Sequence, residues 1–149
     1  MIFKDDLDHD CVDLPVEQRE TVAVLTVAAP RFPEVFGDRL LKDSDVRDLR
    51  EKIKLVYRMA GSNGKQALVL GLCRSLSDAS RVTDLLSGAM GCGAYGCPPR
   101  HVAEEMKAIL FDEEFVGWFK EVIFAVYPAG RTGQINYDVF KEVFEALES

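Results

Sequence analysis

Residues 88–99 read Gly-Ala-Met-Gly-Cys-Gly-Ala-Tyr-Gly-Cys-Pro-Pro and place four glycines and two prolines directly before a helical pattern that begins at Arg100. Glycine lets the backbone adopt a positive φ and approach a ligand closely, and proline suits the first positions of a helix. Backbone amides in a glycine-rich turn and at a helix start attract anions, phosphate above all. The stretch therefore predicts a phosphate-binding loop, in which the aromatic ring of Tyr95 is placed to contact a sugar or a base.

The segments on either side of this loop predict an α/β fold. Apolar, β-branched runs predict three buried strands, at residues 21–29, 67–71 and 121–127. Apolar residues at helical spacing predict three helices, at residues 45–60, 100–111 and 135–147, the last with Asn136 as its N-cap. Residues 31–45 are rich in Pro, Gly and Asp and predict a loop. Such alternation predicts a largely parallel sheet, and the glycine-rich loop follows the second strand, at the sheet edge where ligands bind.

Composition limits the classes of protein and partner. The 149 residues suffice for one domain with a core. The net charge is −7, from 25 acidic and 18 basic side chains, which argues against a broad nucleic-acid-binding face. No apolar run reaches the roughly 18 residues that span a bilayer, and residues 1–6 lack a signal-peptide pattern. Four irregularly spaced cysteines predict a reduced, intracellular protein, either cytoplasmic or nuclear.

Two residue types near the loop invite a chemical interpretation. Cys92 and Cys97 could suggest a metal pair, but no second pair shares their spacing, so we predict loop-filling thiols with no metal or other cofactor. His101 lies at the start of the predicted helix, where the helix dipole disfavours an imidazolium. We therefore expect a neutral, partly exposed histidine there.

The loop and its flanks resemble a known family. Leu-Val-Leu-Gly at residues 68–71, the glycine-rich run at 89–96, Pro98-Pro99 and Val102-Ala103 occur in the order found in the macrodomain-like, microbial-type poly(ADP-ribose) glycohydrolases. Residues 24–30 and 122–127 resemble the strands on either side in that family. The resemblance covers most of residues 20–146, about the C-terminal half of such a domain. It implies a three-layer α/β/α macrodomain-like sheet, present here as one partial domain over residues 1–149 with the N-terminal half missing.

The resemblance also implies a ligand, ADP-ribose or an ADP-ribosylated protein. The glycine-rich loop would wrap the diphosphate, Tyr95 would lie beside the distal ribose, and Tyr127 would lie on the adenine side. The substrate-binding residues that it implies are Gly91, Cys92, Gly93, Ala94, Tyr95, Gly96 and Tyr127.

The chain departs from the family in its catalytic signature. These glycohydrolases, which cleave ADP-ribosyl O-glycosidic bonds, carry a Gly-Gly-Gly stretch followed by Gln-Glu-Glu, and neither occurs here. Cleavage of this kind needs a carboxylic acid to protonate the leaving group. No catalytic residue is therefore predicted, and the chain alone is expected to be inactive. A non-catalytic module for ADP-ribose or another nucleotide diphosphate, and a non-functional fragment, remain alternative interpretations.

A second departure is an interruption between strand and loop. In the family the strand and the loop are nearly continuous, whereas residues 72–88 intervene here and show no clear period. We interpret residues 72–88 as an insertion and hypothesise a translated intron or another gene-model artefact. Mature transcripts that retain this segment and start at Met1 would contradict that hypothesis. A sheet without its N-terminal half should expose strand edges and apolar surface, which predicts self-association.

Overall fold

The computed structural model describes residues 12–18, 23–72, 90–93, 95–126, 128 and 130–145. The predictions made for residues 73–88, Ala94 and Tyr127 lie outside these described residues. The short helix η2 (Val16–Gln18) precedes the elements described below.

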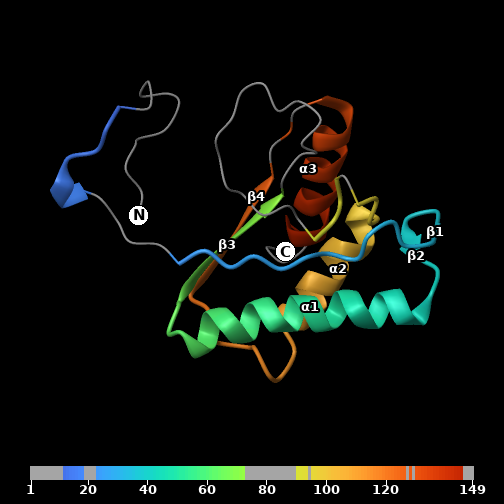
Figure 1. Ribbon diagram of the computed structural model, residues 1–149, viewed down its shortest axis with the longest axis horizontal. Coiled ribbons are helices and arrows are strands. Elements are labelled where there is room, and N and C mark those ends of the chain that lie inside the picture. Colours follow the sequence, from blue (N-terminus) through green and yellow to red (C-terminus); the bar gives the residue numbers. More distant parts are fainter. Residues whose placement is uncertain are drawn as a thin grey trace.

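Two parallel strands form the centre of the fold (Figure 1). Strand β3 (Ala67–Leu72) pairs with β4 (Glu121–Val126), and the register places Leu68 opposite Val122 and Leu70 opposite Phe124. This pairing confirms the second and third predicted strands and their parallel direction. The strand β3 also includes Leu72, the first residue of the segment interpreted as an insertion.

The first predicted strand is wrong for the part of it that the structure describes. Residues 23–30 form no strand, Val24 is 61% exposed, and only Ala29 and Pro30 in this segment are buried. A β-branched run needs a neighbouring strand to pair with, and no described strand pairs with this one. The segment instead runs beside the glycine-rich loop.

Residues 31–45, predicted as a loop, contain a small hairpin. Strands β1 (Val35–Phe36) and β2 (Arg39–Leu40) pair antiparallel, and Gly37 takes a φ of 61° in the turn between them. The sequence predicts only a loop here, because strands of two residues are too short to show an alternating apolar pattern.

Three helices complete the described chain: α1 (Asp43–Ser62), α2 (Pro99–Leu110) and α3 (Gly130–Glu145). Helices α1 and α2 match their predicted ranges within two residues at each end. Helix α3 begins five residues earlier than expected, so Asn136 lies inside the helix, buried, and is not its N-cap.

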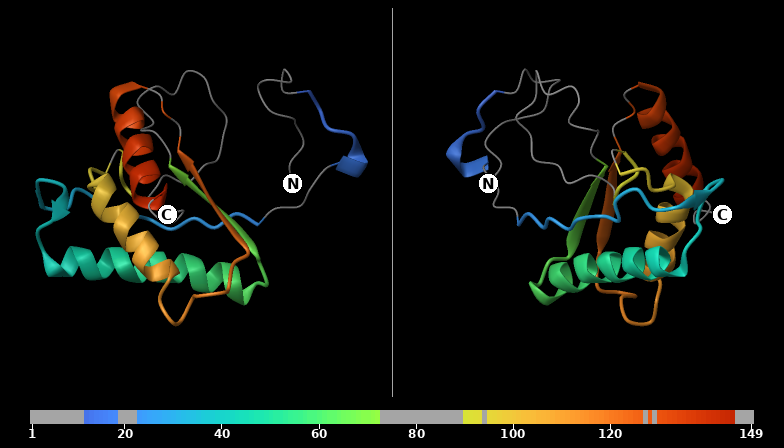
Figure 2. Two further views of the ribbon diagram at one scale, coloured as in Figure 1. Left: turned by 180° about the vertical axis from the view of Figure 1, so that it is seen from behind. Right: turned by 45° about the vertical axis from the view of Figure 1, so that its right-hand side comes forward.

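Helices α2 and α3 lie on one face of the strand pair, and α3 packs directly against β4. Phe124 of β4 lies 5.7 Å from Phe140 and 4.2 Å from Phe144 of α3, centroid to centroid, and both views in Figure 2 show α2 and α3 on the same side of the strands. On the opposite face, Val69 is 57% and Ile123 46% exposed. The described residues thus form one helical layer on one sheet layer.

The C-terminal part of α1 packs against the aromatic residues that follow α2. Tyr57 makes edge-on contacts with Phe115 and Phe119, at centroid distances of 5.5 Å and 5.8 Å, and its hydroxyl donates to the Met106 carbonyl. These contacts attach Phe115 and Phe119 to the core. No helix among the described residues is both long and apolar enough to cross a membrane.

Candidate functional site

The glycine-rich loop folds back on itself before α2. Gly91 and Gly96 take φ values of +87° and +71°, a region that side chains other than glycine resist. The Cys97 amide donates to the Gly91 carbonyl at 2.9 Å, and the Gly96 amide donates to the Gly93 carbonyl at 3.2 Å. The glycines therefore serve the conformational role predicted from the sequence.

Gly91 also lies where no side chain fits. A Cβ atom there would lie 2.7 Å from the Cys97 Sγ and 3.0 Å from the Ala29 Cβ. Contacts under 3 Å force neighbouring atoms to move. The loop is thus packed closely against its own end and against the segment that precedes the β1–β2 hairpin.

Three hydrogen bonds join the loop to distant parts of the chain. The Phe32 amide donates to the Tyr95 carbonyl at 2.9 Å. The Cys97 thiol donates to the Pro30 carbonyl at 3.4 Å, and the Asn136 side-chain amide donates to the Cys92 carbonyl at 3.3 Å. The loop is therefore held on both sides, by residues 30–32 and by helix α3.

Asn136 is the residue that sequence reasoning assigned to the wrong role. It was predicted to cap α3, whereas its buried side chain supports the loop. A signal was present, because Asn136 lies four residues before Phe140 and seven before Val143, on the buried face of the helix. A polar residue on an apolar helix face needs a hydrogen-bond partner, and here the partner is a loop carbonyl.

Several loop amides are oriented without an internal acceptor. Among the described residues, the amides of Cys92, Gly93 and Tyr95 donate to no backbone carbonyl. Helix α2 follows directly, with Pro98 at its N-cap and no side chain capping its first amides. Amides in a glycine-rich turn and at a helix start are donors that can bind anions.

The structure brings together those predicted site residues that it describes. They are consecutive or nearly so in one folded loop, and the side chain of Tyr95 is 38% exposed. The predicted residues that form the described loop are Gly91, Cys92, Gly93, Tyr95 and Gly96. Ala94 and Tyr127 lie outside the described residues.

The two loop cysteines are buried. Burial raises the pKa of the Cys92 thiol well above its usual value, and it raises the pKa of Cys97 to about 11. Thiols act as nucleophiles and metal ligands only as thiolates. Their burial and raised pKa values favour packing beneath the loop as the role of both thiols.

His101 is more buried than predicted. Only 7% of the residue is exposed, and neither ring nitrogen has a hydrogen-bond partner within the described part of the chain. Burial lowers the pKa of His101, and Glu105, with its Oε1 3.9 Å from the Nε2, opposes that shift. The expectation of partial exposure is wrong because this turn of α2 faces the rest of the fold, where Arg50 of α1 pairs with Glu105.

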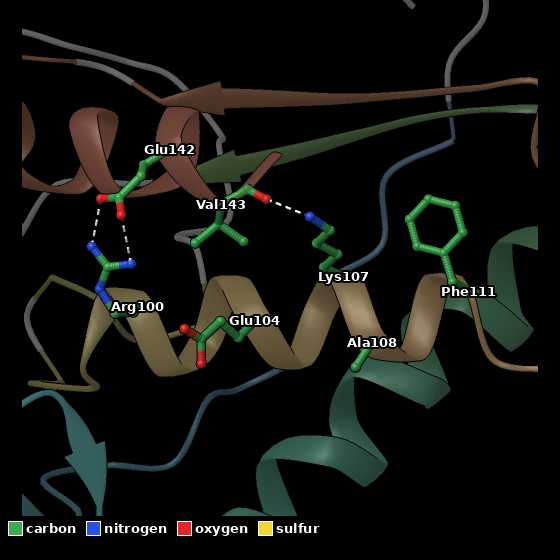
Figure 3. Close-up of a pocket in the computed structure, with 7 residues that line it drawn as sticks. All are labelled: Arg100, Glu104, Lys107, Ala108, Phe111, Glu142 and Val143. Carbon is green, nitrogen blue, oxygen red and sulfur yellow. Dashed lines mark hydrogen bonds and ion pairs between the residues drawn. The ribbon is translucent and has the colours of Figure 1, made fainter. Parts of the chain in front are cut away.

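A shallow groove of about 500 Å³ lies on α2 and α3, away from the predicted site residues (Figure 3). Arg100 makes two hydrogen bonds, of 3.2 Å and 2.5 Å, to Glu142. Lys107 donates to the Val143 carbonyl at 2.7 Å in the last turn of α3. Both cations that line the groove are therefore used to hold the two helices together, and the groove is not the predicted anion site.

The order strand, glycine-rich loop, helix and parallel strand defines an α/β protein with a candidate anion-binding loop. No protein-family model matches the chain, and no curated protein is detectably similar to it in sequence. Solved structures are similar to it. Poly(ADP-ribose) glycohydrolase from Deinococcus radiodurans, in complex with ADP-ribose, matches 70% of this chain at 26% identity with a TM-score of 0.54, and the match covers 34% of that chain.

Poly(ADP-ribose) glycohydrolase from Thermomonospora curvata matches 70% of this chain at 28% identity, with a TM-score of 0.53 over 32% of its own length. A mutant of that protein matches 68% at 29% identity, with a TM-score of 0.52 over 32%. The resemblance to this family is confirmed in structure. The chain spans about a third of the length of these structures.

Proposed function

We propose that this chain binds ADP-ribose through its glycine-rich loop, as a protein related to the poly(ADP-ribose) glycohydrolases. The observation that carries the proposal is the loop itself, with Gly91 and Gly96 at positive φ and Asn136 bonded to the Cys92 carbonyl. The similarity to a poly(ADP-ribose) glycohydrolase solved with ADP-ribose supports the choice of ligand. The proposed binding residues are Gly91, Cys92, Gly93, Ala94, Tyr95, Gly96 and Tyr127.

The chemistry of such binding follows from the loop. The amides of Cys92 and Gly93 and the start of α2 would donate to diphosphate oxygens, since these donors have no backbone acceptor among the described residues. The half-exposed ring of Tyr95 would pack against the distal ribose, and Tyr127 would lie on the adenine side. In this proposal residues 1–149 form a partial domain of a three-layer macrodomain-like fold, with an insertion before the loop. The sheet of that fold would place these groups at the carboxyl ends of its strands.

We further propose binding without hydrolysis by this chain. Its 149 residues contain neither a Gly-Gly-Gly stretch nor a Gln-Glu-Glu stretch. Burial raises the pKa of the Cys92 and Cys97 thiols, which disfavours the thiolate form that acts as a nucleophile. A glycohydrolase assay of this chain on ADP-ribosylated protein should therefore release no ADP-ribose, and release above the rate without protein would contradict this part of the proposal.

Calorimetric titration with ADP-ribose tests the binding itself. Tyr95→Ala should weaken binding by about 1–2 kcal/mol, the scale of an aromatic stacking contact. Tyr137→Ala is a matched control, because Tyr137 on α3 is 39% exposed and Tyr95 is 38% exposed. No heat at millimolar ADP-ribose, or equal affinities for the two variants, would contradict the proposed site.

The same titration distinguishes an ADP-ribose site from the alternative, a general site for nucleotide diphosphates. A site that also contacts the distal ribose should bind ADP-ribose more tightly than ADP, and Tyr95→Ala should remove that difference. Equal affinity of the wild-type chain for the two ligands would favour the alternative.

A further inference from the structure

Phe32 adopts a backbone conformation that is unusual for an aromatic residue. Its φ is +49°, in the left-handed region, and its side chain is 66% exposed. For a bulky residue this conformation is strained and persists only where surrounding structure imposes it. Such strain gathers at ligand-binding sites, so the position of Phe32 relative to the loop matters.

Phe32 contacts the glycine-rich loop through both its backbone and its ring. The Phe32 amide donates to the Tyr95 carbonyl at 2.9 Å, which fixes the backbone of Phe32 on the loop. The ring extends over the end of the loop, where its Cδ1 lies 3.9 Å from the position of a Cβ on Gly96. The guanidinium carbon of Arg31 lies 5.4 Å from the centre of the same ring, within the range of a cation–π contact.

Arg31 differs from most described arginines in its partners. Its side chain is exposed, and no ion pair joins it to a carboxylate within the described ranges. Four other arginines are each paired with a glutamate in the described structure: Arg39, Arg50, Arg58 and Arg100. In a chain of net charge −7, this guanidinium carries a positive charge that has no carboxylate partner within the described ranges.

We propose that Arg31 is an anion-binding residue of the loop site and that Phe32 positions it. The inference rests on the proposed function and adds to it a full positive charge for the diphosphate, supplied from outside the loop. Guanidinium groups donate two parallel hydrogen bonds to phosphate oxygens. The Phe32 ring limits the conformations of the Arg31 side chain, so less freedom is lost when the anion binds.

Substitution of Arg31 tests the anion contact. Arg31→Gln should weaken binding of ADP-ribose and of inorganic pyrophosphate about tenfold each, the effect expected for a lost charge-assisted hydrogen bond. It should also reduce the salt dependence of the affinity. Arg47→Gln is the matched control, because Arg47 is an exposed arginine of α1 whose side chain donates to the Asp43 carbonyl, and it should bind both ligands as the wild type does.

Substitution of Phe32 tests the positioning role separately from folding. Asparagine tolerates a positive φ, so Phe32→Asn should keep or raise the Tm while it weakens ADP-ribose binding several-fold. A purely structural role for Phe32 would give the opposite pattern, a change in Tm with unchanged affinity, and would overturn the positioning role.

The outcomes distinguish the two proposals. If the wild-type chain gives no heat with millimolar ADP-ribose, the proposed function fails and this inference fails with it. If the wild type binds and Tyr95→Ala weakens binding, but Arg31→Gln and Arg47→Gln bind equally well, only the inference about Arg31 is overturned.

Discussion

At the scale of single residues, the loop requires a glycine at position 91 and a hydrogen-bond donor at position 136. Gly91 combines a φ of +87° with a position where a Cβ would contact the Cys97 Sγ and the Ala29 Cβ. The side-chain amide of Asn136 donates a hydrogen bond to the Cys92 carbonyl in the loop. The shape of the loop is therefore fixed by packing from three segments of the chain.

Replacement of Gly91 by alanine tests this packing. We expect Gly91→Ala to lower the free energy of unfolding by about 2–4 kcal/mol, since it adds a steric clash to the cost of a positive φ. Gly37→Ala is the control, because Gly37 has a φ of +61° and nothing within 4 Å of a Cβ. Urea denaturation of the two variants should show the larger loss at Gly91, and equal losses would contradict close packing of the loop.

A second residue-scale prediction concerns His101 and pH. Burial lowers the pKa of His101 in the folded chain, with Arg39 acting in the same direction and the carboxylates of Glu104, Glu105 and Asp38 opposing. Below about pH 6.5 the unfolded chain binds a proton at His101 before the folded chain does. The free energy of unfolding therefore decreases as the pH falls from about 6.5 to the lowered pKa of the folded chain. Urea denaturation between pH 5 and pH 8 should show this loss in the wild type.

The variant His101→Leu should have a flatter profile over the same range. It removes the titrating group and also the two buried ring nitrogens that lack partners in the described chain. A slope as steep as that of the wild type would mean that other groups cause the pH dependence.

At the scale of elements, the helices were predictable and the edges of the sheet were not. The buried face of α1 repeats Leu49, Ile53, Tyr57 and Ala60 at helical spacing, and this pattern is visible in the sequence alone. The run at residues 23–30 has strand composition, yet a strand forms only where a partner strand is available. The residue pattern of one segment does not show whether a partner strand is available to it.

The C-terminal end of α1 offers a test of packing between elements. A Cβ on Gly61 would lie 2.2 Å from the Trp118 ring, so Gly61→Ala should lower stability by about 1–2 kcal/mol, after the gain in helix propensity is counted. In a Trp118→Leu background the same substitution should cost much less, which a double-mutant cycle measures. Additive effects would show that the two residues do not contact.

The candidate site was predictable in part. The glycines and Tyr95 were identified from composition and spacing, because positive φ and anion binding depend on local residue types. The contributions of Phe32, Pro30 and Asn136 were not, because each depends on a tertiary contact with the loop. His101 was correctly predicted to favour its neutral form, but for a different reason, since burial is the main cause of its lowered pKa.

At the scale of the whole molecule, one face of the β3–β4 sheet carries exposed apolar side chains in the described part of the chain. Val69 and Ile123 lie opposite each other in the β3–β4 register and are 57% and 46% exposed. Parallel sheets are normally covered on both faces, and exposed apolar sheet surface promotes association. The wild-type chain should therefore self-associate at micromolar to millimolar concentrations.

The double variant Val69→Thr with Ile123→Thr should reduce this association, because threonine keeps the strand preference and removes apolar surface. Sedimentation velocity over a concentration series provides the measurement. The exposed pair Val35 and Leu41, replaced by threonine, serves as a control for apolar surface away from the sheet face. A wild-type chain that sediments as a monomer throughout would contradict the prediction.

The central claim is that the glycine-rich loop binds ADP-ribose, and nuclear magnetic resonance of the glycine amides tests it most directly. In a chain labelled with ¹⁵N at glycine, titration with ADP-ribose should shift the amide signals of Gly91, Gly93 and Gly96, while those of Gly37 and Gly64, in turns elsewhere, stay in place. Loop signals that do not move at millimolar ADP-ribose, or shifts confined to glycines outside the loop, would contradict the account.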